Sequence, residues 1–465
     1  MSGAPEPPAE ATVDVVVLGA GPAGEVAAGG LAQRGHAVTL VEADLVGGEC
    51  AYYACMPSKA LLRPAQALAE ARRVPGAQSA GEALDVAAVL ARRDEVVSHL
   101  DDAHQLPWLE DRGIELIRGH GRLDGPRRVR IGERLRLARQ AVIVAVGSVA
   151  SLPPIPGLAE AAPWTNREIT LARRVPERLI VLGGGPAGVE MADAFTSLGA
   201  HVVLIEAQER LLAREEPYAS EELRAALADR GVEIHLATGV ERVEREPGIV
   251  RARLADGRTV AAEEIFVGTG RRPSTDDLGL DTVGLAAGGF IEVDDSLRVP
   301  GLPWLYAIGD VNGRSLQTHV GKRQAAIVAD ILDGRDPGAG AETVTPPRVI
   351  FTEPQVAAVG MTLADARAGG ADAHAYDVAS SATAGASFHG RGTPGTSRIV
   401  VDEARGVLLG ATFVGSDVAE WLHAATIAIV GAVPVERLRE AIPAFPTRSE
   451  VWLKLLEERD ARRAR

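Results

Sequence analysis

The chain has 465 residues with a formal net charge of −14, and 46% of its residues are hydrophobic. A chain of this length is too long for one ordinary core and indicates about three domains. The negative charge argues against nucleic acid or an anionic membrane as a partner, and no apolar run is long enough for a membrane span. With 51 glycines, the composition is typical of a soluble α/β protein with many tight turns.

The N-terminal residues 1–12 are expected to form a disordered tail. The first ten residues are rich in proline and acidic side chains and do not resemble a signal peptide. We therefore expect the protein to be cytoplasmic.

Residues 13–18 predict a buried parallel strand, since they are mostly β-branched and nearly free of polar groups. A glycine-rich turn, an alanine-rich helix and a second strand ending at Glu42 follow. In this arrangement Gly19 permits the turn, Gly21 lets a pyrophosphate approach the helix N-terminus, and Gly24 permits close packing of helix on strand. The acid then binds ribose hydroxyls, so the segment predicts a dinucleotide site.

The two cysteines of the chain, Cys50 and Cys55, lie five positions apart. On a helix this spacing gives a rise of about 7.5 Å, beyond the ~4.4–6.8 Å that a disulfide tolerates between Cα atoms. If the cysteines bridge, residues 50–55 must therefore leave the helical conformation. Pro57 suits a first helical turn, which places Cys55 at a helix N-terminus that favours a thiolate. The plainer alternative is two buried cysteines that happen to be close.

Residues 47–59 resemble the redox-active signature G-G-T-C-x-x-x-x-C-x-P-S-K of the flavoprotein disulfide reductases, which include lipoamide dehydrogenase, glutathione reductase and mercuric reductase. Glu49 replaces the usual Thr. The resemblance implies that Gly48 and Lys59 lie at a bound FAD. It also implies that Cys50 attacks the substrate and that Cys55 contacts the flavin.

Residues 60–110 are predicted to be helical, with Pro64 and Pro107 marking bends or ends. Short apolar strands are expected between residues 113 and 131. Within them, Gly121 lies where the resembled family passes its backbone beside the adenine of FAD.

A further buried strand is predicted over residues 140–146, and it ends at Gly147 in a segment that resembles the family's A-T-G-S. The prolines at 153, 154 and 156 then indicate a domain boundary.

An internal repeat is the most informative feature after the cysteines, because residues 17–43 recur without a gap as residues 181–207. The second copy has the equivalent residues Gly183, Gly185, Gly188 and Glu206. Two dinucleotide folds imply two dinucleotides, with FAD in the first and a nicotinamide cofactor in the second. Because Glu206 would repel the 2′-phosphate of NADP, we predict NADH, although Arg210 and Arg214 leave NADPH open.

The two copies differ at Glu190, where the first copy has Val26. In the resembled family this Glu pairs with the Lys of the P-S-K motif beside the flavin. Lys59 is one of only three lysines in the chain, so we predict a Lys59–Glu190 ion pair that stabilises reduced flavin. The alternative is that Glu190 is an ordinary surface charge.

Residues 268–273 resemble the G-R-x-P segment with which the family returns to the FAD domain, which places Gly270 and Arg271 at the cofactor. Asp310 follows a short strand and resembles the acid that binds the ribityl chain. Thr318 begins the next helix, whose N-terminus would face the flavin pyrimidine.

Residues 346–465 resemble the family's dimerisation domain, which implies a homodimer with an active site shared between subunits. The family ends in H-P-T-x-x-E, but here Phe445 replaces the proton-transferring His and Glu450 is kept. Loss of a general acid-base group costs about 10²–10⁴-fold in rate. His389 and His423 are conceivable substitutes, although ordinary structural roles are favoured for both.

The sequence therefore predicts an α/β fold with two Rossmann-like domains and an α+β dimerisation domain. We assign residues 13–150 and 271–345 to FAD, residues 151–270 to NAD(P) and residues 346–465 to the dimer. The predicted function is hydride transfer from NAD(P)H through FAD and the cysteine pair to a small sulfur substrate, with no metal site. The alternatives are a C–S bond-cleaving enzyme similar to 2-ketopropyl-coenzyme M oxidoreductase/carboxylase, a quinone or metal reductase that does not need the cysteines, and a non-enzymatic flavoprotein subunit.

Overall fold

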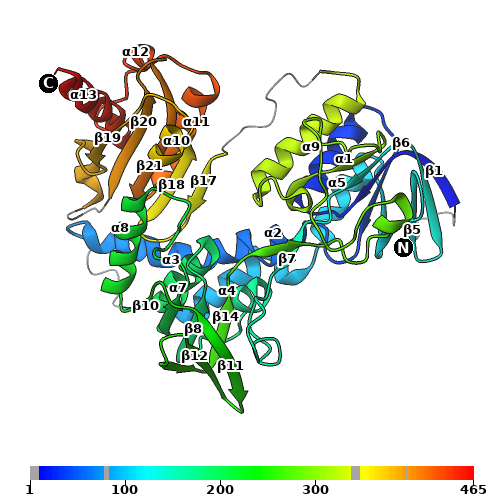
Figure 1. Ribbon diagram of the computed structural model, residues 1–465, viewed down its shortest axis with the longest axis horizontal. Helices are drawn as coiled ribbons and strands as arrows, with labels where there is room; N and C mark the ends of the chain where they lie inside the picture. Colours follow the sequence, from blue (N-terminus) through cyan, green and yellow to red (C-terminus); the bar gives the residue numbers. More distant parts are fainter. Residues whose placement is uncertain (1–9, 78–82, 337–345, 391, 393–394, 465) are drawn as a thin grey trace. The chain divides into compact units, whose positions relative to one another are not determined.

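The computed structural model describes residues 10–77, 83–336, 346–390, 392 and 395–464. The chain divides into two compact units (Figure 1). Unit 1 comprises Met1–Pro57, Asp94–Ser151 and Gly270–Glu342, and unit 2 comprises Ser58–Arg93, Leu152–Thr269 and Thr343–Arg465.

Unit 1 is built on one large sheet. Its strands are β1 (Glu10–Leu18), β2 (Val38–Glu42), β3 (Glu115–Arg118), β4 (Gly121–Leu123), β5 (Arg128–Ile131), β6 (Arg134–Val144) and β16 (Leu305–Ala307). Their order is β3-β2-β1-β6-β5-β4, with β16 also paired to β6. The pairs made by β1, β2, β3 and β16 are parallel, whereas β4 and β5 form antiparallel pairs. A parallel sheet of buried β-branched strands is the Rossmann-like arrangement that the sequence predicts.

Two long helices, α1 (Pro22–Gln33) and α9 (Thr318–Leu332), lie side by side in unit 1 (Figure 1). At Gly30 the two helices pack at an ordinary distance, since a Cβ there would lie 3.8 Å from the Cβ of Ala329. The remaining elements of this unit are α2 (Gly48–Tyr52), η1 (Ser98–Leu100), η2 (Ala103–Gln105), α5 (Leu106–Asp111), η3 (Leu280–Val283), η4 (Gly309–Asn312) and the two-stranded pair of β7 (Ser148–Ala150) with β15 (Arg271–Pro273). Helix α3 (Cys55–Arg73) begins in unit 1 and continues in unit 2, and α4 (Val86–Val96) begins in unit 2.

Unit 2 contains a second parallel sheet in the order β10-β9-β8-β14, made of β8 (Arg178–Leu182), β9 (His201–Ile205), β10 (Glu233–His235) and β14 (Glu264–Val267). An antiparallel sheet of β11 (Val240–Glu246), β12 (Ile249–Leu254) and β13 (Thr259–Ala262) accompanies it. The helices of this part are α6 (Asn166–Thr170), α7 (Pro186–Ser197) and α8 (Pro217–Asp229). The order β8, α7, β9 repeats the order β1, α1, β2, which confirms the second Rossmann-like fold.

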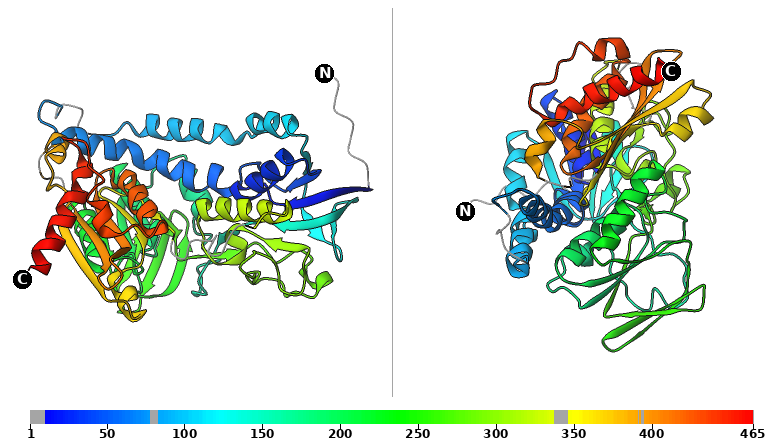
Figure 2. Two further views of the ribbon diagram at one scale, coloured as in Figure 1. Left: turned by 90° about the horizontal axis from the view of Figure 1, so that it is seen from above. Right: turned by 90° about the vertical axis from the view of Figure 1, so that its left-hand side faces the viewer.

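The C-terminal part of unit 2 is a five-stranded antiparallel sheet covered by helices. The strand order is β17-β18-β21-β20-β19, and α13 packs on β19, as the red helix and orange strands of Figure 2 show. The elements are β17 (Arg348–Ile350), β18 (Gln355–Gly360), α10 (Leu363–Ala368), β19 (Ala373–Ala379), η5 (Gly385–His389), β20 (Thr396–Asp402), β21 (Val407–Gly415), η6 (Val418–Trp421), α11 (Leu422–Val430), α12 (Val435–Leu438), η7 (Arg448–Glu450) and α13 (Val451–Arg463). The α/β class and the α+β C-terminal domain are thus confirmed.

One local expectation is wrong. Residues 10–12, assigned to the disordered tail, begin β1 because the long strand β6 offers them backbone partners, and Glu10 pairs with Leu135. Pro64, which the sequence predicts to mark a bend or an end, lies inside α3 and therefore does not end that helix. The lost hydrogen bond of a mid-helix proline is offset there by the burial of Leu61 and Leu62 in the core of unit 2.

The rest of the proposed tail, residues 1–9, lies outside the described residues. The division into FAD, NAD(P) and dimerisation domains stays a prediction, since the chain separates into two units and residues 58–93 group with the second. None of the described helices combines the length and the apolar character that a membrane span requires.

Candidate functional site

The two cysteines lie at adjoining helix ends. Helix α2 stops at Tyr52 and α3 starts at Cys55, so the chain has the break in the helix that a bridge between the cysteines would require. The two cysteines do not form a disulfide with each other. Cys50 is hydrogen-bonded to Cys55, and this bond and burial raise the pKa of the Cys50 thiol. The Thr318 hydroxyl at the start of α9 donates to Cys50 Sγ over 3.1 Å and lies 3.5 Å from Cys55 Sγ.

The first glycine-rich turn has the geometry that its sequence predicts. Gly19 has a φ of +99°, and a Cβ on Gly24 would lie only 1.8 Å from the Gly19 carbonyl oxygen. A Cβ on Gly21 would meet no atom within 4 Å, so a pyrophosphate has room at the start of α1. The Ala20 N–H donates to Glu42 Oε2 over 2.6 Å, and burial raises the pKa of the Glu42 carboxyl.

A polar cluster around Asp310 accompanies this turn in unit 1. Ser148 Oγ donates to Asp310 Oδ2 over 2.5 Å, and Arg271 Nε donates to Ser148 Oγ over 2.7 Å. Arg271 also lies 3.5 Å from a Glu49 carboxylate oxygen. Burial raises the pKa of Asp310. These donors and acceptors, together with the open space at Gly21, fit the phosphates and hydroxyls of a dinucleotide.

The other glycines assigned to this cofactor lie in unit 1 as well. A Cβ on Gly48 would come within 2.8 Å of the Gly21 Cα, and a Cβ on Gly121 within 2.6 Å of a Leu18 methyl group. Gly147 and Gly270 directly precede β7 and β15, which pair with each other. Unit 1, which holds the first glycine-rich turn, thus also contains six residues assigned to this cofactor: Gly48, Gly121, Gly147, Gly270, Arg271 and Asp310.

The second glycine-rich turn repeats the first in unit 2. A Cβ on Gly188 would lie 1.8 Å from the Gly183 carbonyl oxygen, and a Cβ on Gly185 would meet no atom within 4 Å. Glu206 accepts from the Gly184 N–H over 2.5 Å. Arg210, which the sequence leaves open as a phosphate ligand, donates instead to the backbone carbonyls of residues 213 and 215.

The predicted ion pair between Lys59 and Glu190 is present, with Lys59 Nζ 2.8 Å from Glu190 Oε2. The Glu190 side chain is only 6% exposed, and the Phe351 N–H donates to its other oxygen over 2.9 Å. Lys59 Nζ also lies 4.8 Å above the Phe351 ring. The ammonium therefore has a fixed position that a carboxylate and an aromatic face both stabilise.

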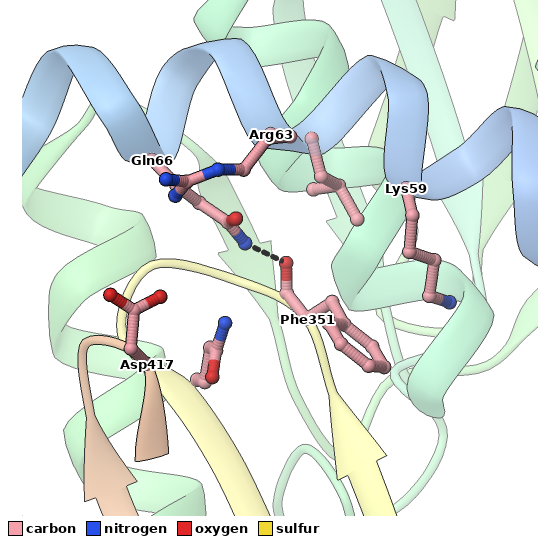
Figure 3. Close-up of a pocket in the computed structure, with 7 residues that line it drawn as sticks. Lys59, Arg63, Gln66, Phe351 and Asp417 are labelled. Carbon is pink, nitrogen blue, oxygen red and sulfur yellow. Dashed lines mark hydrogen bonds between the residues drawn. The ribbon is translucent and has the colours of Figure 1, made fainter. Parts of the chain in front are cut away.

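A pocket of about 240 Å³ lies next to this pair. Figure 3 shows Lys59 and Phe351 on one side of it and Asp417 on the other, with Gln66 donating to the Phe351 carbonyl over 2.7 Å. The lining residues are Lys59, Leu62, Arg63, Gln66, Phe351, Gln355 and Asp417.

The C-terminal motif lies on the surface of unit 2. Phe445 is 77% exposed, and Glu450 accepts from the Gly385 N–H over 3.3 Å. His389 Nδ1 lies 3.0 Å from Glu70 Oε1, whereas His423 is exposed on α11. The roles assigned to Phe445 and Glu450 stay predictions.

Three side chains near these groups were not assigned from the sequence. Ser148 and Glu49 join the Asp310 cluster, and the positive charge of Lys322 on α9 acts to lower the pKa of Cys50. The rarity of lysine in the chain is the signal that could have singled out Lys322. In the described part of the chain, no group of His, Cys, Asp and Glu side chains could hold a metal ion.

Comparison with known proteins agrees with this geometry. The pyridine nucleotide-disulphide oxidoreductase family matches residues 13–326, and the dimerisation domain of the same family matches residues 346–456. A dihydrolipoyl dehydrogenase of Haloferax volcanii is 31% identical over 96% of this chain and 95% of its own, and a mercuric reductase of Streptomyces lividans is 31% identical over 95% of each. The flavoprotein disulfide reductase RclA of Escherichia coli superposes with a TM-score of 0.86 at 27% identity, covering 96% of this chain and 99% of that one. The chain is therefore a member of the pyridine nucleotide-disulphide oxidoreductase family, an enzyme that uses a flavin and a pyridine nucleotide.

Proposed function

We propose that this protein is an FAD-dependent NADH oxidoreductase that reduces a small disulfide, or a related sulfur substrate, through Cys50 and Cys55. The observation that carries the proposal is the thiol pair itself. The two sulfurs are hydrogen-bonded to each other, and both lie within reach of one hydroxyl in the unit that holds the first glycine-rich turn. Two isolated buried thiols would not need this arrangement.

The cofactor assignment rests on the two glycine-rich turns and on their acids. We assign FAD to unit 1, where Gly21 and Asp310 would hold its pyrophosphate and its ribityl chain. We assign the nicotinamide cofactor to residues 151–270. NADH is favoured because Glu206 would face the ribose hydroxyls and because Arg210 is engaged by backbone carbonyls.

FAD, when bound, supplies the hydride chemistry that links NADH to the cysteines. Cys50, as a thiolate, attacks one sulfur of the substrate disulfide and releases the other as a thiol. The half that was attacked stays bonded to Cys50 as a mixed disulfide. Cys55 then attacks the Cys50 sulfur, which closes the Cys50–Cys55 disulfide and releases the remaining half as the second thiol. For each turn, one NADH, one proton and one disulfide give NAD⁺ and two thiols.

The remaining residues would tune this cycle. Lys59, fixed by Glu190, would place a positive charge four residues after Cys55 on the same helix and would stabilise reduced flavin. Phe445 would leave the proton-transfer position apolar, with Glu450 kept beside it. The dimerisation domain supports a homodimer, in which we propose that each subunit completes the active site of its partner.

Single cysteine variants test the proposal. Cys50→Ser should still be reduced by NADH in a single turnover but should lose catalytic turnover with small disulfides. Cys55→Ser should lose both the contact through which the flavin reduces the cysteine pair and the catalytic turnover. Unchanged turnover in both variants would remove the cysteines from the mechanism.

A soft metal ion is a second candidate acceptor. Mercuric reductases are among the relatives, and RclA has been solved as a Cu(II) complex. Adjacent thiols are soft ligands that suit such ions. Reduction of Hg²⁺ or Cu²⁺ that persists in the double Cys→Ser variant would favour direct transfer from the flavin.

A further inference from the structure

The thiol pair receives a hydrogen bond from a side chain that belongs to neither cysteine helix. Thr318 is the first residue of α9, and its hydroxyl donates to Cys50 Sγ over 3.1 Å while lying 3.5 Å from Cys55 Sγ. The same hydroxyl can therefore accept a proton from the Cys55 thiol and donate its own proton to Cys50.

We propose that Thr318 is a positioning residue for the redox pair, whose hydroxyl stabilises the thiolate of Cys50 by hydrogen bonding and orients its sulfur for attack. This proposal rests on the proposed function. Phe445 stands at the proton-transfer position and cannot stabilise the Cys50 thiolate, so the Thr318 hydroxyl would supply part of that stabilisation. On ionisation the Cys50 proton leaves for solvent, while Thr318 keeps its own proton and only donates it.

The groups around Cys50 either oppose or favour its ionisation, and the Thr318 hydroxyl is among those that favour it. The neighbouring Cys55 and burial oppose ionisation of Cys50, whereas the Thr318 hydrogen bond and the charge of Lys322 favour it. Lys322 lies one helical turn after Thr318 and is exposed, so solvent weakens its field. Glu25 on α1 faces Lys322, and burial raises the pKa of its carboxyl to about 7.

The substitution Thr318→Val removes the hydroxyl and keeps the shape, and Thr318→Ser keeps the hydroxyl and removes the methyl group. The holoenzyme is reduced with dithiothreitol and alkylated with iodoacetamide between pH 6 and 9, and peptide fragmentation separates the rates at Cys50 and Cys55. Only the thiolate reacts, so the rate below the pKa follows the thiolate fraction.

Loss of a hydrogen bond to a charged group should slow Cys50 alkylation in T318V by about tenfold, which is a shift of its pH profile by about one unit. Alkylation at Cys55, which lies farther from the hydroxyl, should slow less, and T318S should react at a rate near that of the wild type. In urea all three proteins should react alike.

An unchanged Cys50 rate in T318V would overturn the proposal, as would equal slowing at both cysteines in T318V and T318S. A large effect of Lys322→Gln with none of T318V would assign the role to the lysine instead. Because this assay uses neither NADH nor substrate, it stands apart from the proposed function. If NADH fails to reduce the wild-type cysteine pair, the proposed function fails while the Thr318 result keeps its meaning.

Discussion

The two glycine-rich turns offer a matched pair of substitutions. In Gly24→Ala the new Cβ would lie 1.8 Å from the Gly19 carbonyl oxygen, and in Gly188→Ala it would lie 1.8 Å from the Gly183 carbonyl oxygen. The two changes are sterically equal, but they affect different turns. We expect G24A to lose flavin and G188A to keep flavin while binding NADH weakly.

The size of the effect follows from the distance. A carbon and a carbonyl oxygen normally approach to about 3.3 Å, so the helix must retreat from its strand by about 1.5 Å. Overpacking of this kind costs about 1–3 kcal/mol, which weakens binding about 5- to 150-fold if the nucleotide needs the original geometry. The N–H groups at the helix start would no longer meet the pyrophosphate at hydrogen-bonding distance.

The assay is the flavin content of the purified proteins, followed by FAD titration of the flavin-free forms and by NADH titration of the flavin-loaded forms. Gly30→Ala is the control, because a Cβ there meets only Ala329 at 3.8 Å and alanine favours a helix. Flavin retained in G24A together with flavin lost in G188A would refute the assignment of FAD to the first turn.

Three further predictions concern single side chains. Lys59→Met alone should lower the melting temperature by more than Lys59→Met combined with Glu190→Gln. The single change leaves the buried Glu190 carboxylate without its cation, at a cost of about 2 kcal/mol. Equal losses in the two variants would show that the pair is not coupled. Phe445→His should raise disulfide turnover about tenfold or more and give it a pH optimum near the imidazole pKa, since it restores an acid-base group five residues before Glu450; a flat pH profile would count against this. Burial raises the pKa of Glu25 from 4.5 to about 7, so its contribution to stability is full below pH 4.5 and is lost as the pH rises through about 7. Glu25→Gln should therefore raise the melting temperature relative to the wild type at pH 8 but not at pH 4.5, and a difference that does not vary with pH would contradict the burial argument.

The Rossmann-like folds could be predicted because their determinants are local. Gly19, Gly24 and Glu42 act within one strand-turn-helix-strand unit, and the repeat at residues 181–207 supplied a second, independent copy. The spacing of Cys50 and Cys55 is also a local feature, and helix geometry shows from it that a bridge between them needs a break in the helix. Lys59 and Glu190 are far apart in sequence, and their contact was predicted from the family resemblance.

The parts that sequence reasoning missed depend on tertiary partners. Residues 10–12 form a strand only because β6 extends alongside them. The sequence left open whether Pro64 bends or ends its helix, and the helix continues there because the neighbouring leucines are buried. The contact of Thr318 with both sulfurs joins residues more than 260 positions apart. No local pattern encodes such a contact, and so Thr318 was assigned only to the flavin.

An anaerobic titration of the flavin-loaded protein with NADH would show whether electrons from NADH reach the Cys50–Cys55 pair. The visible spectrum and the number of alkylatable thiols would be followed through the first two electrons and then through four. If electrons reach the cysteine pair, a long-wavelength charge-transfer band and two new thiols per chain should appear at the two-electron stage. Bleaching of the flavin at that stage with no new thiols would contradict this transfer, and would make quinones or metal ions the leading acceptors.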